Sequence, residues 1–222
     1  MIPKVEEGYY KNLFTWKDLE NIINIRPLMK SERIYAPGVE EKFQWDANRW
    51  MTDTSCYPST IIKKFIDEYV TIITDVSRYN EKLNEFCSKL ENKVERCVDA
   101  QIFLCRNLNI KDHPFGIHYD RNNNVIVQCE GITNWKVWDY IDESDPDNHL
   151  KHDIQSVGST QMKDLGDPII DFDLKPGDAI WVPHQHPHLA TSKTKRMSIS
   201  FPWQDKPIPA NINIQDRTWV KI

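Results

Sequence analysis

The sequence has no apolar run long enough to cross a membrane and no sign of an export signal. A membrane-spanning helix needs about 18 consecutive apolar residues, and no stretch of this chain approaches that length. The opening Met-Ile-Pro-Lys-Val-Glu-Glu lacks the basic and then apolar layout of a signal peptide. We therefore expect a soluble, cytoplasmic protein that is not processed at its N-terminus.

Closely spaced cysteines are also missing. The five cysteines are scattered and form no Cys-x-x-Cys pair, whereas disulfide scaffolds and thiolate zinc sites both use close, even spacings. The set therefore predicts buried, apolar thiols without chemistry of their own.

Positive charge is in deficit. The chain has 28 Lys and Arg against 33 Asp and Glu, a net charge of -5, and no basic tract longer than Lys193-Thr194-Lys195-Arg196. Proteins that bind duplex nucleic acid neutralise phosphates with a basic surface, so we expect a peptide or a small molecule as substrate instead.

The length of 222 residues predicts one domain, because single cores reach roughly 150 to 250 residues before a chain divides. Within residues 1–222 we expect a mostly helical part over 1–99. Thr15 and Asp18 form a capping box that predicts a helix running towards Ile25. Apolar residues recur at helical intervals from Ile62 to Val76 and again from Leu83 to Val94, which predicts two amphipathic helices.

From about residue 100 the pattern changes to short runs of β-branched and aromatic residues between turn formers. We predict strands over 101–105, 116–120, 124–130, 133–140, 169–173, 179–183 and 197–201. Many short strands without intervening helices indicate an antiparallel sandwich or barrel over residues 100–205. Residues 206–222 form a tail.

One group of side chains has the residue types and spacing of a metal site. His118 and Asp120 stand two residues apart, so alternation along a strand points both to one face and Tyr119 to the other. His188, at the end of Pro183-His184-Gln185-His186-Pro187-His188, supplies a third ligand. Two histidines and one carboxylate on one face of the metal are diagnostic of non-haem Fe(II) oxygenases. The three alternate imidazoles of the second segment leave a zinc site open as the alternative.

Together, several motifs resemble one family. They are His118-Tyr119-Asp120, Asn124, Gln128-x-x-Gly131-x-x-x-Trp135, Pro176-Gly177-Asp178-x-x-x-x-Pro183-x-x-x-Pro187-His188 and Met197-Ser198-Ile199-Ser200-Phe201. In these motifs the chain resembles the JmjC-like, cupin-type 2-oxoglutarate oxygenases, a family that includes protein hydroxylases. The resemblance covers the second half of the chain. It implies a mainly β fold, a double-stranded β-helix (cupin or jelly-roll) core buttressed by N-terminal α-helices.

The resemblance also implies a ligand set. Fe(II) would be held by His118, Asp120 and His188, with 2-oxoglutarate and dioxygen as cosubstrates. The reaction would hydroxylate a peptide side chain or a small molecule. Family members commonly dimerise through terminal segments, so a homodimer stays open.

The chain departs from the family at the group that anchors the distal carboxylate of 2-oxoglutarate. In the most similar members a Lys stands where this chain has Thr133. A buried carboxylate needs a cationic partner, and the resemblance offers Arg196 with Ser198, in an Arg-x-Ser order used by other branches, ahead of Lys136. Asn124 matches a position that contacts the cosubstrate or an iron ligand. Asn124, Ile126 and Gln128 alternate onto one face, which we expect to line the pocket, and Thr133 and Trp135 continue this lining.

Because of this departure, two alternatives stay open. One is a metal-dependent cupin enzyme that does not use 2-oxoglutarate. The other is a non-catalytic binding module on the same barrel, against which the complete set of His118, Asp120 and His188 argues.

Overall fold

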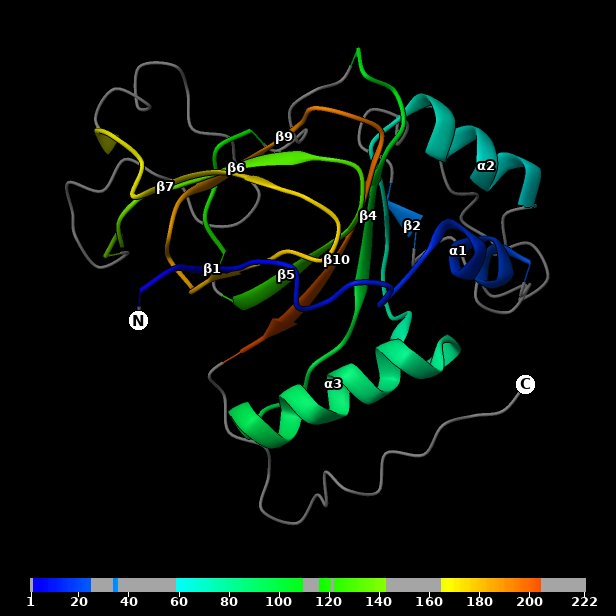
Figure 1. Ribbon diagram of the computed structural model, residues 1–222, viewed down its shortest axis with the longest axis horizontal. Helices are drawn as coiled ribbons and strands as arrows, with labels where there is room; N and C mark the ends of the chain where they lie inside the picture. Colours follow the sequence, from blue (N-terminus) through cyan, green and yellow to red (C-terminus); the bar gives the residue numbers. More distant parts are fainter. Residues whose placement is uncertain are drawn as a thin grey trace, which may run out of the picture.

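The strands of the protein form two antiparallel sheets that face each other (Figure 1). The computed structural model describes residues 2–24, 34–35, 59–109, 116–120, 122–142 and 165–204. In the larger sheet the strand order is β1-β8-β5-β10-β4-β3-β2, and in the smaller sheet it is β7-β6-β9. From β5 onwards the chain passes back and forth between the sheets, with β5, β8 and β10 in the larger one and β6, β7 and β9 in the smaller one, as in a jelly roll. The predicted fold class, a double-stranded β-helix with helices on its outside, is confirmed.

The strands are short, and the side chains along most of them alternate between the two faces of their sheet. Their bounds are β1 Lys4–Glu6, β2 Ile34–Tyr35, β3 Thr71–Ile73, β4 Gln101–Cys105, β5 Asn123–Glu130, β6 Thr133–Val137, β7 Ile170–Leu174, β8 Ala179–Val182, β9 His188–Ser192 and β10 Arg196–Trp203. In β6 and β9 every second residue is buried, because these positions point between the sheets. The inward residues of both sheets form an apolar cluster that includes Ile126, Val137 and Ile180.

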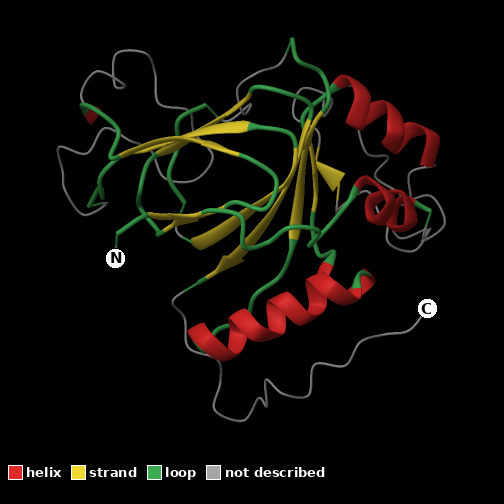
Figure 2. Ribbon diagram, viewed as in Figure 1, coloured by secondary structure: helices red, strands yellow, loops and turns green. Residues whose placement is uncertain are grey.

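Three helices, α1 Trp16–Ile23, α2 Ser59–Glu68 and α3 Glu81–Val94, cover the outer face of the larger sheet (Figure 2). Their apolar sides join the outward residues of β4, β5 and β10 in one core. The predicted capping box of α1 is present: the Asp18 amide donates to the Thr15 hydroxyl, and the Thr15 amide donates to the Asp18 carboxylate. Within the described residues, no helix is long and apolar enough to cross a membrane.

One helix prediction was wrong in its extent. The apolar spacing from Ile62 to Val76 predicted a continuous helix, but α2 ends at Glu68 and Thr71–Ile73 forms β3. The β-branched side chains of this segment are buried, and β3 pairs with β4 in the larger sheet. Tertiary pairing therefore overrides the helical period here.

The strand predictions are confirmed within one or two residues for β4, β5, β7, β8 and β10. β6 ends at Val137, three residues before the predicted end, and β9 was not predicted. Residues 116–120 form no full strand and make a single bridge, between His118 and His188. The tail over 206–222, His149, His152 and most of the acidic run after Asp142 lie outside the described residues.

Gly131 joins β5 to β6 and allows a close approach to the turn before β10. Its φ is +71°, and a Cβ atom there would lie 2.0 Å from the carbonyl oxygen of Lys195. We predict that Gly131→Ala lowers the free energy of unfolding by about 3 kcal/mol, since the left-handed backbone costs about 1–2 kcal/mol and crowding adds a similar amount.

The matched control is Gly166→Ala. Gly166 has nearly the same φ, +67°, but no atom of the described residues lies within 4 Å of the added Cβ. In this variant the free energy of unfolding should fall only by the cost of the left-handed backbone, about 1–2 kcal/mol. Urea unfolding of both variants measures the difference, and equal losses would contradict the role of the close approach.

Candidate metal centre and cavity

Backbone pairing brings the two separate metal-ligand segments together. His118 and His188 are directly opposite each other: the amide of each donates to the carbonyl of the other, at 3.2 Å and 2.8 Å. The amide of Gln185 donates to the carbonyl of Asp120 at 2.8 Å, and Gln185 has a left-handed φ of 58° that turns the chain there. The loop that ends at His188 is therefore tied to both ends of the His-x-Asp segment.

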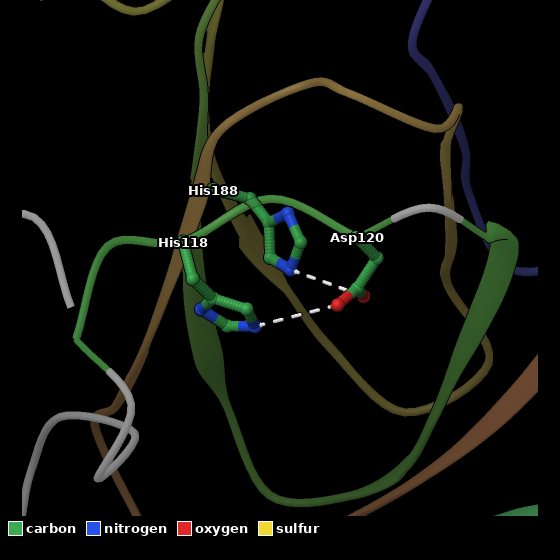
Figure 3. A group of neighbouring side chains, drawn as sticks. All are labelled: His118, Asp120 and His188. Atoms are coloured by element: carbon green, nitrogen blue, oxygen red, sulfur yellow. Dashed lines mark ion pairs between the residues drawn. The ribbon is translucent and has the colours of Figure 1, made fainter. Parts of the chain in front are cut away.

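The three side chains converge on one point (Figure 3). His118 Nε2 lies 4.0 Å from Asp120 Oδ1, and His188 Nε2 lies 3.8 Å from Asp120 Oδ2. All three ligand atoms lie within 4.8 Å of one another. Tyr119 points the other way, into a cluster with Ile117, so the predicted alternation of the His-x-Asp segment is seen.

Hydrogen bonds on the far side of each imidazole orient the rings. His118 Nδ1 lies 3.1 Å from the carbonyl oxygen of Gly116, and His188 Nδ1 lies 3.0 Å from that of His186. A carbonyl only accepts, so Nδ1 carries a proton, and in a neutral imidazole with this tautomer the lone pair is on Nε2. Burial, and then the neighbouring His118, lower the pKa of His188 to about 4, which keeps this imidazole neutral at pH 7.

Three electron-pair donors that converge without a proton donor between them match the needs of a divalent cation. The set of two nitrogens and one oxygen, drawn from one side of the cavity, is the facial arrangement that non-haem Fe(II) uses. The residues present therefore fit such an ion, which His118, Asp120 and His188 would hold at the wall of the cavity.

The alternative zinc site is not assembled. His186 Nδ1 lies 3.1 Å from the carbonyl oxygen of His184, and both rings lie against Tyr140 rather than beside His188. Among the described residues, the one group of potential metal ligands is His118, Asp120 and His188.

A cavity of about 370 Å³ lies between the sheets, next to the three ligands. Its apolar lining includes Ile126, Trp135 and Ala190, and the Trp135 ring stacks on His188 with centroids 5.8 Å apart. Its polar lining includes Gln101, Asn122, Asn124, Ser198, Ser200 and Arg196.

Arg196 is a buried cation at this cavity. The residue is 1% exposed, and its Nε donates to Ser192 Oγ at 2.7 Å while its Nη1 donates to Ser198 Oγ at 3.2 Å. Both partners are neutral, and no carboxylate pairs with Arg196 in the part of the chain that the structure describes. Burial lowers its pKa to about 10, so the guanidinium stays charged at pH 7. An uncompensated buried charge of this kind calls for an anionic ligand.

The other predicted cosubstrate residues differ in position. Asn124 lines the cavity and accepts a hydrogen bond from Ser200 at 2.8 Å. Thr133 is fully buried on β6, opposite Ser192, and its Oγ1 has no hydrogen-bond partner among the described residues. Lys136 points outward: its Nζ lies 3.6 Å from Asp171, and its side chain is 41% exposed. Lys136 is therefore placed outside the cavity.

Three further residues surround the site: Gln128 and Trp135 were expected on pocket-facing positions, whereas Ser192 was not predicted there. Ser192 and Gln128 belong to the hydrogen-bond network around Arg196, and Trp135 stacks on His188. The alternation of β5 and β6 puts Gln128 and Trp135 on inward faces, a signal present in the sequence. The contact with Ser192 depends on how β9 pairs, which the sequence does not display.

Comparison with known proteins agrees with this geometry. A model of the JmjC domain matches residues 79–209. The chain is 24% identical over 198 residues to the bifunctional lysine-specific demethylase and histidyl-hydroxylase NO66 of Drosophila persimilis, covering 89% of this chain and 27% of that protein. The same protein of Dictyostelium discoideum is 23% identical over 186 residues, covering 84% and 34%.

Two solved structures share the fold. Escherichia coli ycfD aligns with a TM-score of 0.55 at 17% identity, covering 94% of this chain and 50% of that chain. YcfD, a ribosomal oxygenase in complex with cobalt and 2-oxoglutarate, aligns with a TM-score of 0.51 at 16% identity, covering 95% and 49%. This chain thus spans about half the length of these structures and about a third or less of the two sequence relatives.

Proposed function

This chain belongs to the JmjC domain family, and we propose that it is an Fe(II)- and 2-oxoglutarate-dependent hydroxylase. The observation that carries the proposal is the meeting, in one cavity, of a two-histidine, one-carboxylate set and a buried arginine that has no acidic partner among the described residues. The first supplies a facial metal site, and the second suits the distal carboxylate of a dicarboxylic cosubstrate.

In this proposal His118, Asp120 and His188 are the metal ligands. When bound, Fe(II) with 2-oxoglutarate and dioxygen supplies oxidising chemistry that yields succinate, carbon dioxide and a hydroxylated C–H position. The protein fixes the two imidazoles through the carbonyls of Gly116 and His186. It also excludes water with the indole of Trp135, which stacks on His188.

We assign the cosubstrate anchor to Arg196. Ser192 and Ser198 hold the guanidinium in place, and a carboxylate would supply the missing counter-charge. Thr133 Oγ1 and Trp135 Nε1, which have no hydrogen-bond partner in the part of the chain that the structure describes, offer further hydrogen bonds. Asn124 lines the same cavity, on the same inward face of the larger sheet as Ser198.

For the substrate, we propose a side chain of a peptide. Two observations support this class. Similar proteins are a histidyl-hydroxylase and a ribosomal oxygenase, and the cavity has neutral hydrogen-bonding groups at Gln101, Asn122 and Ser200 beyond those assigned above.

The test is spectroscopic. Anaerobic addition of Fe(II) and 2-oxoglutarate to the protein should give the weak visible charge-transfer band of an iron chelate, and admission of dioxygen should release succinate when a substrate peptide is supplied. Zn(II) in place of Fe(II) is the control and should give no band. Iron binding without the band would favour a cupin enzyme that does not use 2-oxoglutarate. Tight 2-oxoglutarate binding without turnover would favour a binding module.

A further inference from the structure

Gln128 is the innermost member of the hydrogen-bond chain that leads to Arg196. It is fully buried on β5, and its Nε2 donates to the carbonyl oxygens of Glu130 at 2.7 Å and Gly131 at 3.3 Å. Carbonyls only accept, so the amide nitrogen must face them. The Oε1 atom of Gln128 is therefore turned towards Ser198.

This orientation of the Gln128 amide determines the direction of the hydrogen bonds between Gln128, Ser198 and Arg196. Ser198 Oγ lies 2.8 Å from Gln128 Oε1, which has no hydrogen to give, so the Ser198 hydroxyl donates. Its lone pairs are then left for Arg196 Nη1 at 3.2 Å. A hydroxyl locked as an acceptor fixes one edge of the guanidinium, and Ser192 fixes Nε.

We infer that Gln128 is a positioning residue that holds Arg196 through Ser198 while leaving its charge free, and so sets the selectivity of the cavity for a dicarboxylate. This inference rests on the proposed function. A neutral amide is required because an acid at position 128 would lie one hydroxyl away from the guanidinium and would replace the ligand as its counter-ion.

The experiment compares two ligands that differ only at the far end. 2-Oxoglutarate and 2-oxopentanoate share the metal-chelating 2-oxo acid, but the second has a methyl group where the first has the distal carboxylate. Calorimetry of the metal-loaded protein under anaerobic conditions gives the ratio of their affinities. A general loss of folding would weaken both ligands and leave the ratio unchanged.

Gln128→Glu should lower the preference for 2-oxoglutarate by about tenfold to a hundredfold, the range for hydrogen bonds to a charged group, with 2-oxopentanoate binding unchanged. Gln128→Met, which frees the Ser198 hydroxyl without adding charge, should lower it by roughly threefold to tenfold. The control is Cys129→Ala: this neighbour points to the other side of the sheet, into the helix-covered core, and should keep the wild-type ratio.

Unchanged ratios in both Gln128 variants, with a wild-type protein that prefers 2-oxoglutarate, would overturn this inference and leave the proposed function intact. A wild-type protein without any preference would overturn the assignment of the cosubstrate as well. If Gln128→Glu does not fold, Gln128→Met alone decides.

Discussion

Replacing His118 with alanine should abolish both the charge-transfer band and succinate release. The variant leaves one imidazole and Asp120, and two ligands hold a divalent ion far less tightly than three. Loss of a partner outside the ligand set typically costs roughly 10–100-fold in metal affinity, so loss of a ligand should exceed that range. Equilibrium dialysis against Fe(II) measures the affinity, and the band reports the chelate.

The same loop offers a matched control. His184 and His186 precede His188 at alternate positions, and their rings lie against Tyr140 instead of the metal-ligand group. His184→Ala should therefore keep the band and bind Fe(II) within about twofold of wild type, a change far below the cost of a missing metal contact. A band that survives in His118→Ala but disappears in His184→Ala would refute the assigned ligand set.

This control also shows where sequence reasoning stops. Parity along a strand was enough to place His118 and Asp120 on one side, and the structure agrees. Alternation along a strand did not identify the third ligand, because His184, His186 and His188 all stand at alternate positions in their segment. The choice of His188 needed the family resemblance, and in the structure the bridge between His118 and His188 is what separates this histidine from its two neighbours.

The surroundings of Arg196 were only partly predictable. The order Arg196-x-Ser198 is visible in the sequence, but β10 is buried along nearly its whole length, so burial gives no alternation to read. The pairing of β10 with β5 shifts between Met197 and Ser198, which places Ser198 opposite Gln128. A bulge of this kind arises from the packing of two strands distant in sequence, and the local sequence around Met197 and Ser198 did not predict it.

Most of the fold was predictable, because in most strands the local sequence pattern agrees with the environment of the strand. Strands such as Gln101–Cys105 have local composition that agrees with their environment. The exceptions, β3 and β9, are segments whose neighbours decide their conformation. Ile73 matches a helical period but pairs with β4, and β9 begins at His188, a candidate metal ligand, directly after Pro187.

Removing the charge of Arg196 should uncouple cosubstrate binding from metal binding. In Arg196→Met the distal carboxylate of 2-oxoglutarate loses its cation, which costs about 2 kcal/mol or more, or roughly thirtyfold or more in affinity. Fe(II) binding should persist, because the three ligands are untouched. The Michaelis constant for 2-oxoglutarate, measured with Fe(II) affinity on the same sample, separates the two effects. Lys136→Met is the control, since this cation is paired with Asp171 on the surface, and it should leave both values within about twofold, the small effect of an exposed pair.

A second substitution tests whether the anchor has moved between strands. Thr133 occupies the family's lysine position and lies opposite Ser192, which contacts Arg196, so cations at 133 and 196 would approach one ligand from the two facing sheets. In the Arg196→Met background, Thr133→Lys should recover about tenfold in 2-oxoglutarate affinity, the worth of one partly restored charge-assisted bond. Thr133→Gln, similar in length but neutral, should recover none. Only a cation can replace the electrostatic role of the lost guanidinium. Equal recovery by both variants would therefore show that the size of the side chain at position 133, and not its charge, improves binding.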